Sequence, residues 1–206
     1  MMFNNYKKLI KYLFLTPLLM AFQCDDELIS TIEYNTYSIK ITPKKTFSLN
    51  DTIWVEGRIS AKAFDTAIND SIFNDNNQAN SFYISKFITP TEHSNAKDAI
   101  DSFELIYEVG EFSFLGICEN SKLFADAILD KDQLFYTYKL GLKPKFTGDF
   151  VISGLDGEIQ NVERNLSISE AYPIDRHPKQ IGFLNCEAVS WLYIEESTRE
   201  FLFKVE

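Results

Sequence analysis

Residues 133–142 read Gln-Leu-Phe-Tyr-Thr-Tyr-Lys-Leu-Gly-Leu. Apolar or aromatic side chains recur at every second position, at Leu134, Tyr136, Tyr138, Leu140 and Leu142. Successive side chains of a β-strand point to opposite faces of the sheet, so this spacing places one set together on one face. The stretch therefore predicts a long strand with one face in a core.

Further segments with β-branched and aromatic residues, bounded by Gly, Asn, Asp or Pro, also predict strands. They are 37–42, 52–59, 81–89, 103–109, 111–118, 149–153, 165–169, 191–194 and 201–205. The last two are candidates for a hairpin across residues 195–200. Only residues 122–130 predict a helix of any length, with a weaker one-turn candidate at 96–100.

Strands that recur without alternating helices favour an all-β fold, an antiparallel β-sandwich with at most one or two short helices. A jelly roll or a partly open barrel is the alternative. Residues 140–153 resemble the passage between two late strands of immunoglobulin-like domains, in which the chain crosses between sheets. An aromatic residue near the start of the second strand anchors that corner, and Phe150 has that place here. The resemblance implies an immunoglobulin-like sandwich, although a Phe cannot make the hydroxyl bond of a tyrosine corner.

The composition of the chain argues against several classes of function. The 206 residues suit one domain, and the formal net charge of -10 argues against nucleic acid as a partner. The chain has only 2 His and 3 Cys, which are few ligands for a zinc or haem site, so we expect no metal and no cofactor. No phosphate-binding loop, dinucleotide fingerprint or metalloprotease helix is present, and no catalytic residue is assigned.

The N-terminus has the pattern of an export signal. Residues 1–11 carry Lys7, Lys8 and Lys11 and no acid, and residues 12–23 are largely apolar. That apolar stretch is shorter than the roughly 20 residues that span a bilayer, so a signal peptide over 1–23 is favoured over a retained anchor or a buried helix.

Cys24 follows this stretch directly, and acids follow it at 25–27. The segment Leu-Leu-Met-Ala-Phe-Gln-Cys at 18–24 resembles bacterial lipoprotein precursors of the Bacteroidota type, although Gln23 stands where a small residue is usual. The resemblance implies cleavage before Cys24, lipidation of that residue and anchoring in the outer membrane. The acids after Cys24 resemble a signal for the cell surface. In enteric bacteria Asp at this place resembles an inner-membrane retention signal, and the third interpretation is a solvated tether.

These patterns divide the chain into a signal peptide (1–23), an acidic tether (24–35) and a single β-sandwich domain (36–206). Cys118 and Cys186 would then lie in an oxidising compartment, where disulfides persist. A bond between them would close a long loop, worth about 4 kcal/mol in the chain-entropy model. Sequence separation says nothing of the distance between them, so a disulfide and two separate buried thiols stay open.

Two further groups of residues are candidate sites. Thr66 and Ser71 lie in a polar loop and match the O-glycosylation triplet of exported Bacteroidota proteins, an Asp followed by Ser or Thr and a small apolar residue. Trp54 and Trp191 lie in predicted strands, where core positions or half-exposed strand faces are the simplest expectation. An exposed pair of aromatics on a β-sandwich would instead make a sugar-stacking platform.

The function expected from these features is a non-catalytic binding or assembly role in a lipoprotein of the outer membrane or cell surface. Its partners would be the membrane, through the lipid anchor, and a glycan or another envelope protein. The alternatives are a glycan-active hydrolase that uses a carboxylate pair, or a sugar-binding accessory of a polysaccharide uptake system. Fold alone does not separate them.

Overall fold

The computed structural model describes residues 31–75, 79–154, 157–160, 165, 167–178, 180–186, 188–193 and 199–206. Cys24 and the predicted signal peptide lie outside these ranges. The chain divides into two compact units, one of Met1–Glu33 with Phe64–Asp70 and one of Tyr34–Ala63 with Ser71–Glu206. No described helix is both long and apolar enough to cross a membrane.

The smaller unit contains a short strand pair. Strand β1 (Ile32–Glu33) runs antiparallel to β5 (Lys62–Asp65), and the Thr66 hydroxyl donates a hydrogen bond to the main-chain oxygen of Thr31 (3.0 Å). Strand β6 (Asp70–Phe73) follows β5 in the order of the same three-stranded sheet. Residues 32–33, expected as the end of the tether, thus take part in a sheet.

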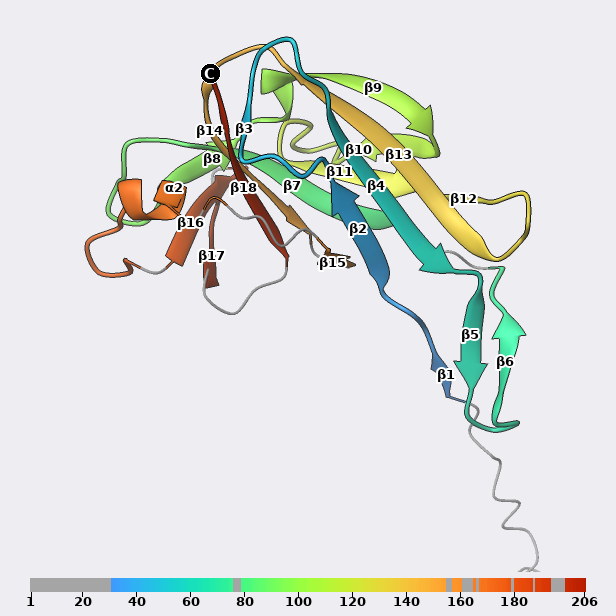
Figure 1. The fold of residues 1–206 in the computed structure, drawn as a ribbon. Coiled ribbons are helices and arrows are strands. Elements are labelled where there is room, and N and C mark those ends of the chain that lie inside the picture. Colours follow the sequence, from blue (N-terminus) through green and yellow to red (C-terminus); the bar gives the residue numbers. More distant parts are fainter. Residues whose placement is uncertain are drawn as a thin grey trace, which may run out of the picture. The chain divides into compact units, whose positions relative to one another are not determined.

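The larger unit contains two sheets (Figure 1). The six-stranded sheet has the order β12-β13-β4-β2-β15, with β9 beside β13. Its strands are β12 (Ile128–Leu129), β13 (Phe135–Pro144), β4 (Ile53–Ser60), β2 (Tyr37–Ile41), β15 (Gly157–Ile159) and β9 (Phe103–Val109). All of its pairings are antiparallel except that of β15 with β2, which is parallel.

The nine-stranded sheet has the order β17-β16-β8-β7-β14-β18-β3, with β11 beside β7 and β10 beside β11. Its strands are β17 (Ala188–Tyr193), β16 (Gln180–Asn185), β8 (Ala96–Asp98), β7 (Asn80–Phe87), β14 (Gly148–Gly154), β18 (Glu200–Val205), β3 (Thr46–Phe47), β11 (Lys122–Asp126) and β10 (Glu111–Phe114). The described helices are the single 3₁₀ turn η1 (Ile100–Ser102) and the short helix α2 (Ser167–Ala171).

The main core lies between the two sheets. Val55, Leu140 and Leu142 come from the six-stranded sheet, and Phe82 and Ile84 come from the nine-stranded one. The predicted all-β sandwich is therefore confirmed. Burial of these side chains at roughly 25 cal/mol per Å² of apolar area supplies the main stabilising term.

Residues 140–153 do cross between the sheets, because β13 belongs to one and β14 to the other. Phe150 is fully buried at the start of β14, and its ring centroid lies 5.0 Å from that of Phe103 and 5.6 Å from that of Phe203. Aromatic packing thus helps to hold the corner, together with the hydrogen bond that Lys86 Nζ donates to the main-chain oxygen of Thr147 (2.8 Å).

Four predictions of local structure were wrong. The one-turn helix candidate at 96–100 instead contains strand β8, and the 3₁₀ turn η1 begins only at Ile100. Residues 122–130 form β11 and β12 instead of a helix, since Leu123 and Ala125 alternate into the core and β11 pairs with β7. The high helix propensity of Leu and Ala gives way to this sheet pairing. The hairpin of the last two strands is also absent, because β17 pairs with β16 and β18 lies between β14 and β3.

The fourth wrong prediction was a strand at 165–169. That region contains α2, whose first residue, Ser167, donates a hydrogen bond from its hydroxyl to Oδ1 of Asn165 (2.7 Å). Ile168 packs into a second cluster with Val151, Leu202 and other residues of the nine-stranded sheet. Ser and Asn favour helix starts, and one apolar anchor is enough for a single turn.

Tyr138 joins the two sheets through the middle of the core. Its ring lies over Gly57 of β4, where an added Cβ would fall only 2.0 Å from a ring carbon. Its hydroxyl accepts a hydrogen bond from Nδ2 of the buried Asn80 on β7 (2.7 Å). Burial raises the pKa of the Tyr138 hydroxyl, so the group stays a neutral hydrogen-bonding partner.

Substitution Tyr138→Phe removes this acceptor and leaves the Asn80 amide buried without it. We expect the free energy of unfolding to fall by about 1–3 kcal/mol, measured by urea titration. The matched control is Tyr107→Phe, since Tyr107 is 52% exposed, and its expected change is below about 0.5 kcal/mol. Equal effects of the two substitutions would show that the bond between the sheets contributes nothing.

Candidate functional site

The outward face of the six-stranded sheet carries rows of polar and charged side chains. Because Tyr138 and Leu140 point into the core, Thr137 and Lys139 of β13 point outward. Strand register sets Lys139 opposite Glu56 of β4, which in turn lies opposite Lys40 of β2. The next row contains Thr137, Arg58 and Ser38. We call this surface the ladder face.

Lys139 is held in place by carboxylates on both sides. Its Nζ lies 3.0 Å from Oε1 of Glu108 on β9 and 3.5 Å from Oε1 of Glu56. The hydrogen bond with Glu108 is the main reason that the pKa of Lys139 is raised. Opposite charges on neighbouring strands stabilise the pairing of β9, β13 and β4.

Trp54 lies at one end of the ladder face, opposite Gly141 of β13. A Cβ on Gly141 would lie 3.0 Å from the indole carbon Cζ3 and 3.1 Å from Cβ of Ile106. The missing side chain therefore leaves room for the indole on the sheet. The ammonium of Lys139 lies 4.6 Å from the centre of the Trp54 ring, within the range of a cation–π interaction.

The ladder face is hollowed into a groove of about 680 Å³ over β2, β4 and β13. Ser38, Lys40, Glu56, Arg58, Phe135 and Thr137 are among the residues that line it. The guanidinium carbon of Arg58 lies 3.3 Å from the centre of the Phe135 ring. A guanidinium stacked in this way keeps the N–H groups at its edge available for a ligand.

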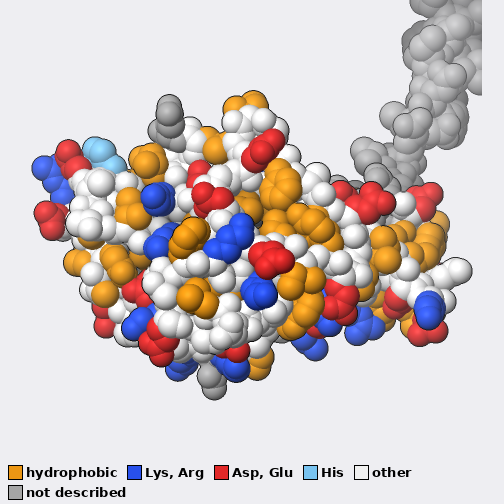
Figure 2. All heavy atoms as spheres, turned by 90° about the horizontal axis from the view of Figure 1, so that it is seen from above, with side chains coloured by type: hydrophobic (Ala, Val, Ile, Leu, Met, Phe, Trp, Pro, Cys, Tyr) orange, Lys and Arg blue, Asp and Glu red, His pale blue; other side chains and the backbone are white. Residues whose placement is uncertain are grey.

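Charge in the groove differs from charge over the whole chain. Lys40 and Arg58 form no ion pair with any described residue, whereas the acid in the described lining, Glu56, is bound to Lys139. The groove thus offers two cations that are not paired with a carboxylate, although the whole chain has a net charge of -10. Figure 2 shows one face of the molecule, on which acidic and basic side chains are interspersed, so net charge does not describe any one patch.

The two tryptophans are not brought together. Trp54 belongs to β4 of the six-stranded sheet, and Trp191 belongs to β17 of the nine-stranded sheet. Trp191 is 39% exposed, and its ring centroid lies 4.8 Å from that of His177. Both indoles lie on partly exposed strand faces, and the alternative, a paired platform, does not form.

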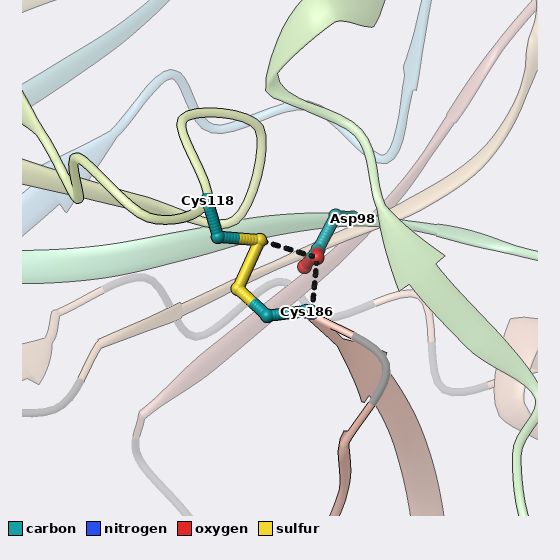
Figure 3. A group of neighbouring side chains, drawn as sticks. All are labelled: Asp98, Cys118 and Cys186. Carbon is teal, nitrogen blue, oxygen red and sulfur yellow. Dashed lines mark hydrogen bonds between the residues drawn. A yellow bond between two sulfur atoms is a disulfide. The ribbon is translucent and has the colours of Figure 1, made fainter.

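Cys118 and Cys186, which the sequence left open, are joined in a disulfide with a Cα–Cα distance of 5.8 Å (Figure 3). The carboxylate of Asp98 lies beside it, and its Oδ2 accepts a hydrogen bond from the backbone N–H of Cys186 (3.0 Å). Sγ of Cys118 lies 3.7 Å from the same oxygen, a contact only, since a disulfide sulfur has no proton to donate. The sulfurs are bonded to each other, so this cluster offers no thiolates to a metal.

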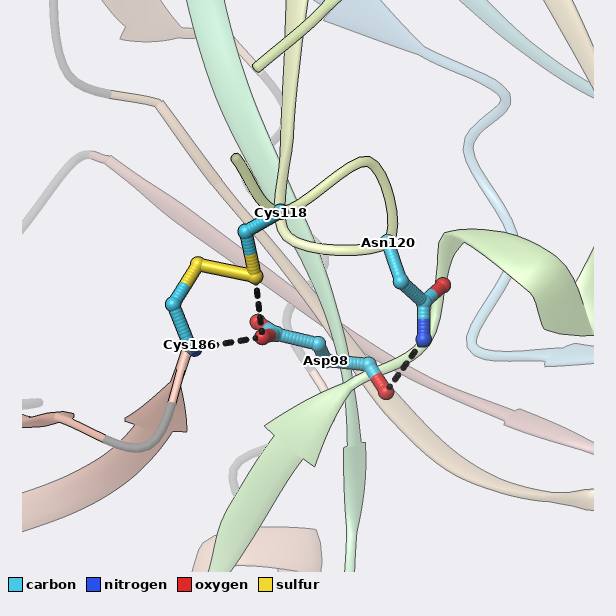
Figure 4. Close-up of a disulfide and its surroundings, with 4 residues drawn as sticks. All are labelled: Asp98, Cys118, Asn120 and Cys186. Carbon is cyan, nitrogen blue, oxygen red and sulfur yellow. Dashed lines mark hydrogen bonds between the residues drawn. A yellow bond between two sulfur atoms is a disulfide. The ribbon is translucent and has the colours of Figure 1, made fainter. Parts of the chain in front are cut away.

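Asp98 also forms a hydrogen bond with the loop that contains the other cysteine, Cys118. Its main-chain oxygen accepts a hydrogen bond from Nδ2 of Asn120 (3.3 Å), in the loop that contains Cys118 (Figure 4). Oδ1 of Asn120 in turn accepts the N–H of Asp101 (2.7 Å). Cys186 has a positive φ of 48°, in the left-handed region that ordinary residues seldom adopt. The bonds around Asp98 hold this turn and the loop of Cys118 in place.

The glycosylation candidates are both exposed. Thr66 lies in the smaller unit and Ser71 lies on β6. Thr66 uses its hydroxyl in the hydrogen bonds with Thr31, so modification of its oxygen would remove the proton donated there. Cys24, the predicted lipidation site, lies outside the described residues.

Comparison with known proteins gives no identification. No protein-family model, curated protein or solved structure matches this chain. The groove and its charges are therefore the structural basis for a functional proposal.

Sequence reasoning missed the main residues of the groove. Arg58 and Phe135 lie on different strands, and they meet only because Phe135 pairs with Ser60 while Arg58 pairs with Thr137. The only sign of the groove in the sequence was the alternation of polar with apolar residues at 135–139 and at 56–58. Strand register, which a single sequence does not provide, was needed to join the two.

Removal of the disulfide by the double substitution Cys118→Ser and Cys186→Ser should lower the free energy of unfolding by about 2–4 kcal/mol. The reason is that the bond closes a span of 68 residues and restricts the unfolded chain. Denaturant titration of the wild type with and without a thiol reductant provides the control. An unchanged midpoint in both comparisons would contradict the prediction.

Proposed function

We propose that this chain is an exported, lipid-anchored envelope protein that binds its ligand in the groove of the ladder face without catalysis. The observation that carries the binding role is the pair of cations in the groove, Lys40 and Arg58, which have no acidic partner among the described residues. Unpaired charges on a surface are normal, but here one of them is pre-oriented on an aromatic ring within a concavity.

The sheet gives this groove a rigid base. Strand β4 is hydrogen-bonded to β13 on one side and to β2 on the other, and the buried Tyr138 lies beneath it. Side chains on such a base lose little conformational freedom on binding, which favours a preformed binding site.

A binding role is favoured over hydrolysis by the chemistry of the described lining. Hydrolysis of a glycoside by acid and base needs two carboxyl groups at a separation of about 5–9.5 Å. Glu56 is the acid that the described lining provides, and it is bound to Lys139. The groove therefore supports recognition of a ligand and gives no support to the hydrolase alternative.

Export and anchoring rest on residues 1–27 alone. A basic start, a short apolar stretch and Cys24 followed by acids support a lipoprotein of the outer membrane. We place the domain at the cell surface, with a periplasm-facing position as the alternative.

The anchoring proposal predicts that Cys24→Ala releases the protein from the membrane fraction and abolishes labelling by a palmitate analogue. The double substitution Cys118→Ser and Cys186→Ser is the matched control, and it should stay membrane-bound and labelled because neither sulfur is the lipidated one. Protease treatment of intact cells then separates the two positions, since a surface protein is digested and a periplasmic one is protected. Membrane retention and labelling of Cys24→Ala would refute the anchor.

The binding proposal predicts that a bulky residue in the groove blocks the ligand. Thr137→Trp should reduce binding of the full-length chain, in detergent, to a panel of neutral polysaccharides, acidic polysaccharides and polyglutamate by about tenfold or more. Glu104→Trp adds the same bulk on the ladder face outside the groove lining and should leave binding unchanged. Equal binding by both variants would place the ligand elsewhere.

A further inference from the structure

The charge and shape of the groove indicate which class of ligand it takes. We infer that the groove binds an acidic polysaccharide, with Arg58 receiving a sugar carboxylate. This inference rests on the proposed binding role of the groove and adds to it the chemical class of the ligand.

Arg58 is built to receive a carboxylate. The central carbon of its guanidinium lies 3.3 Å from the centre of the Phe135 ring, and this contact favours one position of the exposed side chain before a ligand arrives. Two parallel N–H groups at the free edge of a guanidinium match the two oxygens of a carboxylate. Glu56 does not fill this role within the groove, because its Oε1 lies 3.5 Å from Nζ of Lys139 and it forms no described ion pair with Arg58.

Small hydroxyl side chains line the same groove as Arg58. Ser38 and Thr137 lie directly opposite Arg58 on the two neighbouring strands, and Thr36 and Ser60 also line the groove. Each hydroxyl can donate and accept, as the hydroxyls of a sugar ring require. Lys40, in the next row, supplies a second positive charge for a repeating acidic polymer.

A sugar polymer fits this site better than an acidic peptide. Extended peptides gain affinity mainly from main-chain hydrogen bonds to the exposed edge of a sheet. The floor of the groove instead contains β4, whose main chain is already paired with β13 and β2 on its two sides. The ligand therefore meets mainly side chains: hydroxyls, the cations Lys40 and Arg58, the Glu56–Lys139 pair and the Phe135 ring.

The decisive experiment compares acidic polymers with their own neutral derivatives. Polygalacturonate, alginate and hyaluronan are each tested, before and after chemical reduction of their carboxyl groups to alcohols, with the full-length chain in detergent. We expect at least one native polymer to bind and its reduced form to bind about tenfold more weakly or worse. Polyglutamate and dextran sulfate are tested beside them as polyanions without sugar carboxylates.

The variants locate the carboxylate. Arg58→Gln should weaken binding of the acidic polymer about tenfold or more, and Arg58→Lys should keep the charge but recover only part of the affinity. Lys143→Gln is the matched control, because Lys143 lies outside the groove lining and is paired with Glu104 at 3.9 Å. Its binding should equal that of the wild type. Unchanged thermal unfolding of all three variants shows that the fold is intact.

The outcomes separate this inference from the proposed function. Binding of neutral or carboxyl-reduced polymers, blocked by Thr137→Trp, would overturn the inference and leave the binding role in place. Equal or tighter binding of polyglutamate or dextran sulfate would overturn the choice of a sugar carboxylate. Acidic-polymer binding that survives both Arg58→Gln and Thr137→Trp would overturn the groove as the site. No binding to any polymer would overturn the inference, while the anchor would still be decided by Cys24→Ala.

Discussion

Tyr138 is the contact on which the arrangement of the two sheets depends. Its ring needs the missing side chain of Gly57, and its hydroxyl needs the amide of Asn80 on the opposite sheet. A one-residue slip of β13 would move Tyr138 to the outside and turn Thr137 and Lys139 into the core. The register of the core is thus also the register of the ladder face, and the groove exists because the core is packed in this way.

Sequence reasoning recovered the fold class because period-two alternation survives in most of the strands. It failed where one local pattern fits two structures. In residues 122–130, Leu and Ala favour a helix by propensity, but the pairing of β11 with β7 decides the outcome. In residues 165–169, alternating apolar residues suggest a strand, but Ser167 starts a helical turn and a single Ile168 anchors it. The nature of these short segments is set by neighbours distant in sequence.

The site was harder to predict than the fold, because its residues come together only through contacts between segments that are distant in sequence. Trp54 was singled out as an aromatic of functional interest, but its partner is Gly141 on the next strand and not Trp191. Arg58 and Phe135 carry no local motif and become a unit only through diagonal contact between two strands. The disulfide was similarly undecided, because the closeness of residues 118 and 186 comes from the folded chain.

The position of Trp54 gives the protein an intrinsic optical probe. The chain contains 2 Trp, and only Trp54 lies beneath the ammonium of Lys139, a residue that also lines the groove. The other indole, that of Trp191 on β17, contacts the imidazole of His177 and lies outside the groove lining. A ligand in the groove should therefore change the emission of Trp54, while Trp191 provides an internal reference within the same chain.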